Sequence, residues 1–106
     1  MDLKYGFNID KEAIISNLEV LINQTFKLLP LREENTNWQK PLQTIMETLR
    51  GMDRLFIDQS HTFFLLLCKL EGLYTLTEEG DFDMYRRTIF ECLGLLKNIL
   101  DDVKFR

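Results

Sequence analysis

The sequence predicts an all-α protein, an antiparallel four-helix bundle with an extended N-terminal arm. Two observations predict this fold. Apolar residues recur every three or four positions in four segments, which is the period of an amphipathic helix. Short polar stretches separate these segments, so consecutive helices are expected to run antiparallel. We expect a single helical domain over residues 1–106, with an arm at 1–9 and helices at about 11–29, 38–57, 60–76 and 82–104.

The N-terminal arm differs from the rest of the chain because polar and apolar residues alternate in it. Leu3, Tyr5 and Phe7 occupy odd positions of MDLKYGFNID, a period of two that is typical of a half-buried strand. The helical remainder offers no sheet edge, so we expect the arm to lie extended across the bundle with these side chains in its grooves. The alternatives are pairing with the arm of a second copy, addition to a partner's sheet edge, an early start of the first helix, or disorder.

The first helix is expected to begin after Asp10, which is a good N-cap residue. Its apolar residues recur at intervals of three and four, and they predict a core-facing stripe of Ile15, Leu18, Ile22, Phe26 and Leu29. Pro30 is expected to end the helix, because the residue before a proline is disfavoured in the α conformation.

The second helix is expected to be capped by Asn37 or Lys40, with Pro41 tolerated in its first turn. Spacings of 3, 4, 3 and 4 predict its core stripe: Leu42, Ile45, Leu49, Met52 and Phe56. Trp38 stands at the start of this helix. It is interpreted either as a hydrophobic plug over the end of the bundle or as an anchor at an interface with a partner.

The third helix is capped by Asp58 or Ser60 and is apolar on nearly every face, as the stretch FFLLLCKLEGLYTL shows. Such a helix is buried at the centre of a protein or lies against a partner. One continuous helix over residues 38–76 is the alternative. It would extend about 60 Å, which fits only an elongated dimer.

The fourth helix has the cleanest pattern, with Asp81 as its cap. Its core stripe is predicted to be Phe82, Tyr85, Ile89, Cys92, Leu96, Ile99 and Val103. Further apolar residues lie beside this stripe, namely Phe90, Leu93, Leu95 and Leu100. Either a homodimer covers the surplus apolar surface of the third and fourth helices, or an asymmetric bundle wraps it.

Three glycines lie inside predicted helices, each away from the core stripe: Gly51, Gly72 and Gly94. A glycine inside a helix costs about 1 kcal/mol relative to alanine. Either something outside the core approaches the backbone closely at these positions, or the bundle tolerates them.

The composition is that of a soluble globular protein, with 45% apolar and 28% charged residues. The net charge of -4 disfavours direct nucleic-acid binding, since it repels phosphates. The sequence shows no signal peptide and no apolar run near the about 20 residues that cross a bilayer. We therefore expect a cytoplasmic protein that does not enter the membrane, with Cys68 and Cys92 as buried free thiols.

The residues that carry chemistry are few, and we expect no catalytic residues, no cofactor and no metal site. One histidine, His61, and two cysteines in separate helices are too few for a zinc or di-iron site. The glycines are too scattered for a phosphate-binding loop. The helical carboxylates are isolated rather than clustered, so a magnesium-dependent nucleotide hydrolase is the least favoured alternative.

Four arginines are candidate partner-binding residues, together with Leu3, Tyr5, Phe7 and Trp38. Arg50 and Arg54 are four residues apart and share a helix face, while Arg86 and Arg87 are adjacent in the fourth helix. Because acidic residues are interleaved, a surface ladder of ion pairs is favoured. The alternative is an arginine patch that binds a carboxylate or phosphate of a partner.

These observations favour a non-enzymatic protein–protein interaction module, a small adaptor or assembly subunit that also forms a homodimer. In architecture alone, the acidic four-helix chain is similar to bacteriocin immunity proteins and resembles small phage- or plasmid-encoded inhibitors. That resemblance implies the alternative function, an inhibitor or immunity protein that binds a basic surface of its target.

Overall fold

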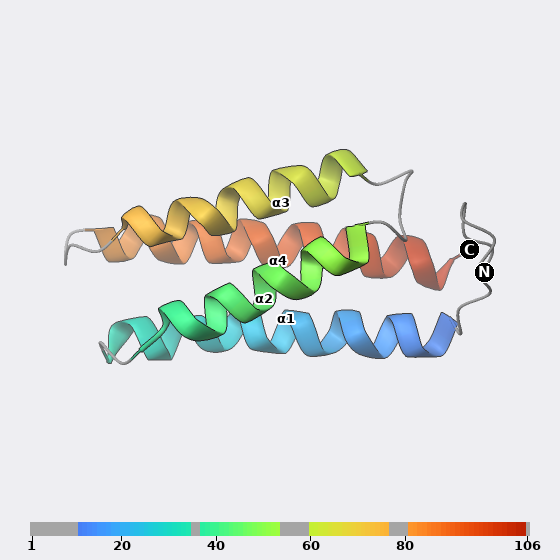
Figure 1. Cartoon of the computed structure of the whole chain (residues 1–106), viewed down its shortest axis with the longest axis horizontal. Helices are drawn as coiled ribbons and strands as arrows, with labels where there is room; N and C mark the ends of the chain where they lie inside the picture. Colours follow the sequence, from blue (N-terminus) through green and yellow to red (C-terminus); the bar gives the residue numbers. More distant parts are fainter. Residues whose placement is uncertain (1–10, 35–36, 54–59, 77–80, 106) are drawn as a thin grey trace.

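The computed structural model of the chain describes residues 11–34, 37–53, 60–76 and 81–105. These residues form four α-helices and no strand: α1 (Lys11–Glu33), α2 (Gln39–Asp53), α3 (Ser60–Gly72) and α4 (Phe82–Lys104), with a 3-10 turn, η2 (Leu73–Thr75), after α3. Successive helices reverse direction, and α1 lies between α2 and α4 while α3 closes the ring on the other side (Figure 1). The predicted antiparallel four-helix bundle is confirmed.

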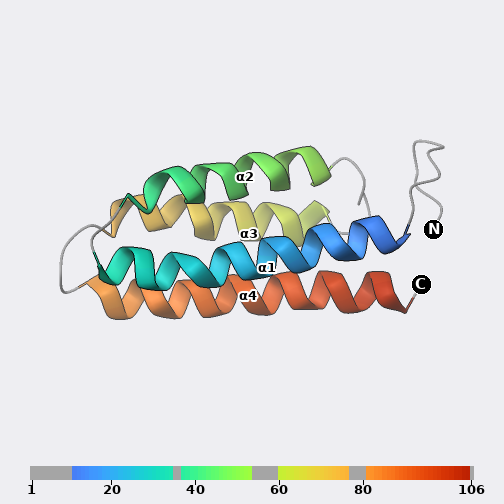
Figure 2. The same ribbon diagram turned by 90° about the horizontal axis from the view of Figure 1, so that it is seen from below.

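The longest contact in the bundle joins the first and last helices. α1 and α4 each have 23 residues, so each is about 34 Å long. They lie side by side along their length, as both views show (Figures 1 and 2). The shape of the chain follows from this pair, with extents of 46 × 21 × 21 Å.

α4 begins and ends where the sequence predicts. Its N-cap residue is Asp81, although the side chain makes no capping hydrogen bond. The predicted stripe from Tyr85 to Val103 is fully buried, and Leu93 and Leu100 beside it are each 8% exposed. Phe82, the first predicted member of the stripe, is only partly buried. From Tyr85 the stripe repeats at intervals of three and four over about five turns, which keeps one face of the helix on the core.

The predicted core stripe of α1 is right at Leu18, whereas its other members each lie one position after a buried residue. The buried residues of α1 are Ile14, Leu18, Leu21, Thr25, Leu28 and Arg32. Phe26, which was expected in the core, is 53% exposed. The buried stripe includes Thr25 and Arg32, which are not apolar. A search for apolar residues alone therefore selects Phe26 and Leu29, each one residue after a buried position.

The prediction that α1 ends before Pro30 is also wrong, because the helix continues one turn beyond it to Glu33. The carbonyl of Pro30 accepts a hydrogen bond of 2.9 Å from the amide of Glu34. A proline inside a helix costs about 3 kcal/mol, so other contacts must hold the last turn. Arg32 supplies them, as described below.

α2 and α3 are separate antiparallel helices, so the alternative of one continuous helix over residues 38–76 is wrong. The Oδ1 atom of Asn37 accepts a hydrogen bond of 3.4 Å from the amide of Lys40, in agreement with its expected capping role. The predicted stripe of α2 is buried from Leu42 to Met52. Phe56, its last predicted member, lies outside the described residues.

α3 buries one face only, although its sequence is apolar on nearly every face. The residues on that face are Phe63, Leu66 and Leu70, followed by Leu73 of η2. Phe64 is 66% exposed and the thiol of Cys68 is exposed. The expectation of a buried Cys68 is therefore wrong, since a spacing of three and four leaves this position on the opposite face. Cys92 is buried, as predicted.

Several predictions fall on residues that the structure does not describe. They concern the arm at residues 1–9, with Leu3, Tyr5 and Phe7, and also Arg54. None of the described helices combines the length and the apolar character that crossing a membrane requires.

Candidate interaction surface

Trp38 closes one end of the bundle. Its side chain is 3% exposed, and its ring meets that of Tyr85 edge-on at a centroid distance of 5.4 Å. The ring of Tyr74 lies 6.3 Å away on another side. The structure therefore supports the interpretation of Trp38 as a plug over the end of the bundle.

Arg32 holds the same end together from inside. The side chain is 8% exposed, and its Nη2 atom donates a hydrogen bond of 3.1 Å to the carbonyl oxygen of Leu76. Its guanidinium carbon lies 5.6 Å from the ring centroid of Trp38 and 5.8 Å from that of Tyr85, within cation–π range. Arg32 near the end of α1 thus contacts Leu76 after α3, Trp38 just before α2 and Tyr85 of α4.

The hydroxyl of Tyr85 completes this cluster by donating a weak hydrogen bond of 3.5 Å to the carbonyl of Leu28. Burial raises the pKa of Tyr85 well above its ordinary value, and the nearby charge of Arg32 opposes that rise. Tyr85 is therefore a neutral phenol beside the buried guanidinium of Arg32, and the contact between them stabilises this end of the bundle.

The surface where α1 meets α4 carries a shallow groove, which we call the α1–α4 groove. Its central hollow, of about 350 Å³, is lined by Ile22, Asn23, Phe26, Phe90, Leu93, Gly94 and Lys97. A hollow of about 280 Å³ shares Ile22, Asn23 and Lys97 with it and extends the groove to Asp101. A hollow of about 740 Å³ touches the groove at Phe90 alone, and all of its lining residues belong to α4.

Two phenylalanines define the apolar centre of the groove. Phe26 on α1 and Phe90 on α4 are 53% and 52% exposed, so both rings are half in water. Both residues lie outside the core stripes of their helices, and the antiparallel packing of α1 and α4 brings them to one hollow. Gly94 lies one turn from Phe90, and a Cβ atom built there would meet no atom within 4 Å. The centre of the groove thus combines aromatic rings with uncovered helix backbone.

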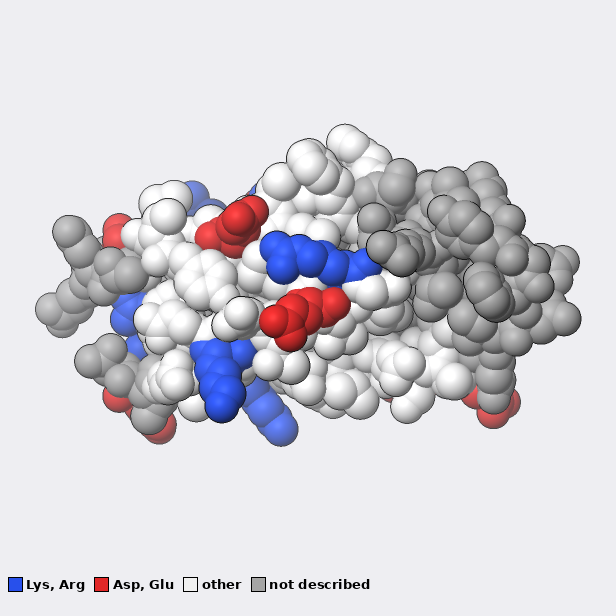
Figure 3. All heavy atoms as spheres, in the orientation of Figure 1, with Lys and Arg blue, Asp and Glu red and all other residues white. Residues whose placement is uncertain are grey.

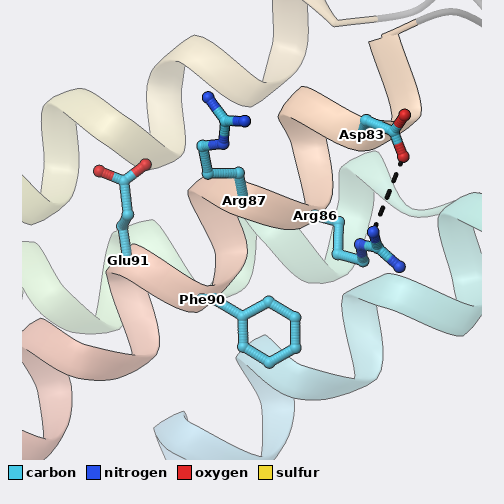
Figure 4. A pocket seen from close by; sticks show the side chains of 5 residues that line it. All are labelled: Asp83, Arg86, Arg87, Phe90 and Glu91. Atoms are coloured by element: carbon cyan, nitrogen blue, oxygen red, sulfur yellow. Dashed lines mark ion pairs between the residues drawn. The ribbon is translucent and has the colours of Figure 1, made fainter.

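Charged residues surround this centre at one end (Figure 4). Arg86 and Phe90 point toward α1, whereas Arg87 and Glu91 point toward α3. Arg86 pairs with Asp83 at 3.8 Å, and both side chains are largely in solvent.

Glu91 is tied to the neighbouring helix α3. It accepts a hydrogen bond of 2.9 Å from the Nζ atom of Lys69, and this bond raises the pKa of Lys69. At the other end of the groove, Glu19 lies near Lys97 and Asp101. Both ends therefore carry both signs of charge.

Of the predicted partner-binding residues that the structure describes, Arg86 points toward the groove, while its neighbour Arg87 points toward α3. Arg50 is exposed on α2, which is not a neighbour of α4 in the ring of helices. Phe26, Lys97 and Asp101 were not predicted as interaction residues. The signal that pointed to this surface was Gly94, an internal glycine away from the core stripe.

Charge is mixed elsewhere as well. Over the described part of the face that α2 and α3 form, acidic and basic side chains are interleaved on a mostly uncharged surface (Figure 3). Within the described ranges, no group of three or more histidine, cysteine, aspartate and glutamate side chains lies close enough to hold a metal ion. Comparison of the chain with protein-family models, with curated proteins and with solved structures finds no match.

Proposed function

We propose that the protein is a non-enzymatic protein–protein interaction module, a small helical subunit that acts by binding another protein chain in the cytoplasm. The observation that carries this proposal is the pair of half-exposed rings, Phe26 and Phe90, around the open backbone of Gly94. Aromatic side chains at the centre of a hollow are typical of the residues that dominate binding energy. Contiguous exposed apolar surface on a folded chain marks interaction sites.

The binding energy available from the two rings is substantial. Fully burying a phenylalanine side chain contributes about 1.5–3 kcal/mol, so covering the exposed half of one ring contributes about 1 kcal/mol. Both rings together then contribute about 2 kcal/mol, equivalent to about thirtyfold in Kd.

The two alternative functions receive less support. An inhibitor or immunity protein that binds a basic surface of its target calls for a one-sided acidic face, but the described part of the face of α2 and α3 mixes both signs (Figure 3). A magnesium-dependent hydrolase needs clustered carboxylates, and the described residues contain no such group.

The test compares partner binding by the unchanged chain, by the double variant Phe26→Ser/Phe90→Ser and by the control Phe64→Ser. The control removes an equally large exposed ring from the outer face of α3, away from the groove. Each tagged protein is expressed in the cells of origin, and each enriched protein is then purified and its binary affinity is measured. An untagged copy of the same chain counts as a partner.

The proposal predicts a partner whose purified affinity falls about thirtyfold with the double variant and stays unchanged with the control. If no enriched protein binds the purified chain, or if the control loses as much affinity as the double variant, the proposal fails.

A further inference from the structure

The outward face of α4 has a regular pattern of its own. Asp83, Arg87, Phe90, Gly94, Lys97, Asp101 and Lys104 follow one another at intervals of three and four residues. All seven are exposed, whereas the stripe from Tyr85 to Val103 on the opposite side is buried. A heptad-spaced stripe on the outside of a helix is the pattern by which two helices pack along their length.

The charges of this face are self-complementary about Gly94. Arg87 lies seven residues before Gly94 and Asp101 lies seven residues after it. Asp83 and Lys104, at eleven before and ten after, are also opposite in sign. Glu91 does not belong to this face, because it points toward α3 and pairs with Lys69. Reversing the helix therefore sets Arg87 against Asp101 and brings Asp83 near Lys104.

We propose that the partner of the α1–α4 groove is a second copy of this chain, bound by antiparallel packing of α4 on α4 about a two-fold axis at Gly94. This inference rests on the proposed function and specifies its partner. A two-fold axis produces an isologous contact, in which each charge pair occurs twice. Opposite charges at symmetric positions are what such a contact requires, and like charges there would prevent it.

The apolar centre fits the same arrangement. Phe90 lies four residues before Gly94 and Lys97 three residues after it, so Phe90 of the second copy meets the hollow between Ile22 and Lys97. The aliphatic stem of a lysine packs on a ring while its ammonium attracts the ring face. At the axis, Gly94 faces its own copy, and the open space over its backbone allows the helices to approach closely.

The test is a charge reversal with an internal rescue. In the first variant, Arg87→Glu places an acidic residue opposite Asp101 of the second copy. In the second, Asp101→Arg is added to Arg87→Glu, which restores opposite charges. Both variants keep α4 stable, because acidic residues near a helix N-terminus and basic residues near its C-terminus suit the helix dipole.

The matched control carries Arg50→Glu, the same change of charge on an exposed residue of α2. Sedimentation equilibrium measures the dimer Kd of each purified protein over protein concentrations from about 1 µM to about 1 mM. Circular dichroism during urea titration checks that each variant folds.

We expect the unchanged chain and the control to dimerise with the same Kd. The first variant should weaken the dimer by about tenfold or more, since each reversed pair occurs twice, and the rescue should return the Kd to within about threefold. A chain that stays monomeric throughout this range overturns the inference. So does a dimer that the reversal leaves unchanged, or one that the added Asp101→Arg does not restore.

The failure of this inference is distinguishable from the failure of the proposed function. A dimer insensitive to the reversal, or a monomer, refutes α4–α4 packing. The proposed function still holds if another protein binds the unchanged chain and binds the variant Phe26→Ser/Phe90→Ser more weakly, and it fails if no other protein does so.

Discussion

The two cysteines should differ in reactivity by orders of magnitude, although the sequence predicts the same buried environment for both. Cys92 is 0% exposed in the core stripe of α4, and burial raises the pKa of its thiol to about 12, against the smaller opposing effect of the Lys69 charge. Cys68 is exposed on the outer face of α3. The perturbation is alkylation of the native protein with iodoacetamide at pH 8.

The magnitude follows from the fraction of thiolate, which is the reactive form. At pH 8 an ordinary cysteine with a pKa of about 8.5 is about one-quarter thiolate. A thiol with a pKa of about 12 is about one part in ten thousand thiolate at the same pH. The difference is about 2,000-fold before steric exclusion is counted, so Cys92 should react in the native state only when the bundle opens.

Peptide mass spectrometry measures the labelling rate of each cysteine. The variant Cys68→Ser isolates the reaction of Cys92, and labelling in urea gives the rate of the same thiol when it is unprotected. We expect rapid labelling of Cys68 in the native protein and labelling of Cys92 only in urea. If Cys92 of the folded variant reacts within about tenfold of its rate in urea, the reasoning from burial and pKa is refuted.

Three further predictions concern stability, each measured as the free energy of unfolding in urea. Because the raised pKa of Cys92 favours the neutral thiol in the folded state, stability should be complete below about pH 8.5, fall by about 2 kcal/mol by pH 10 and decline further toward pH 12. Cys92→Ala should remove that part of the pH dependence, and equal slopes in both proteins would contradict it. Thr25→Val should stabilise the fold by about 1 kcal/mol, since the buried Thr25 hydroxyl has no hydrogen-bond partner among the described residues; a loss of stability would show that the hydroxyl is satisfied. Arg32→Ala should destabilise it by about 2–3 kcal/mol through the lost hydrogen bond to Leu76 and the lost contacts with two rings. An unchanged midpoint for this variant would show that the last turn of α1 does not depend on Arg32.

The parts of the fold that the sequence predicted well are those in which the core stripe is entirely apolar. α4 is the clearest case, because hydrophobic periodicity alone sets its face and its length. In α1 the stripe passes through Thr25 and Arg32, and both residues count as surface residues in a search for apolar periodicity. The same arginine explains the error at Pro30, since local preference predicted a helix end that a tertiary contact overrides.

The groove was harder to predict than the helices. It depends on which residue of α1 lies against which residue of α4, and a pattern within one helix does not contain that information. Arg86 and Arg87 were found because paired arginines are conspicuous, and Gly94 because an internal glycine costs stability. Phe26 was missed because a phenylalanine at helical spacing is normally assigned to the core.

The pairing of α1 with α4 has a consequence for synthesis of the chain. Roughly seventy residues separate the end of α1 from the end of α4, and at about 5–20 residues per second their translation takes roughly 4–14 s. During that time the buried face of α1 has no access to its most extensive partner. The nascent chain therefore exposes Leu18, Leu21 and Leu28 to chaperones until α4 has left the ribosome and can pack against α1.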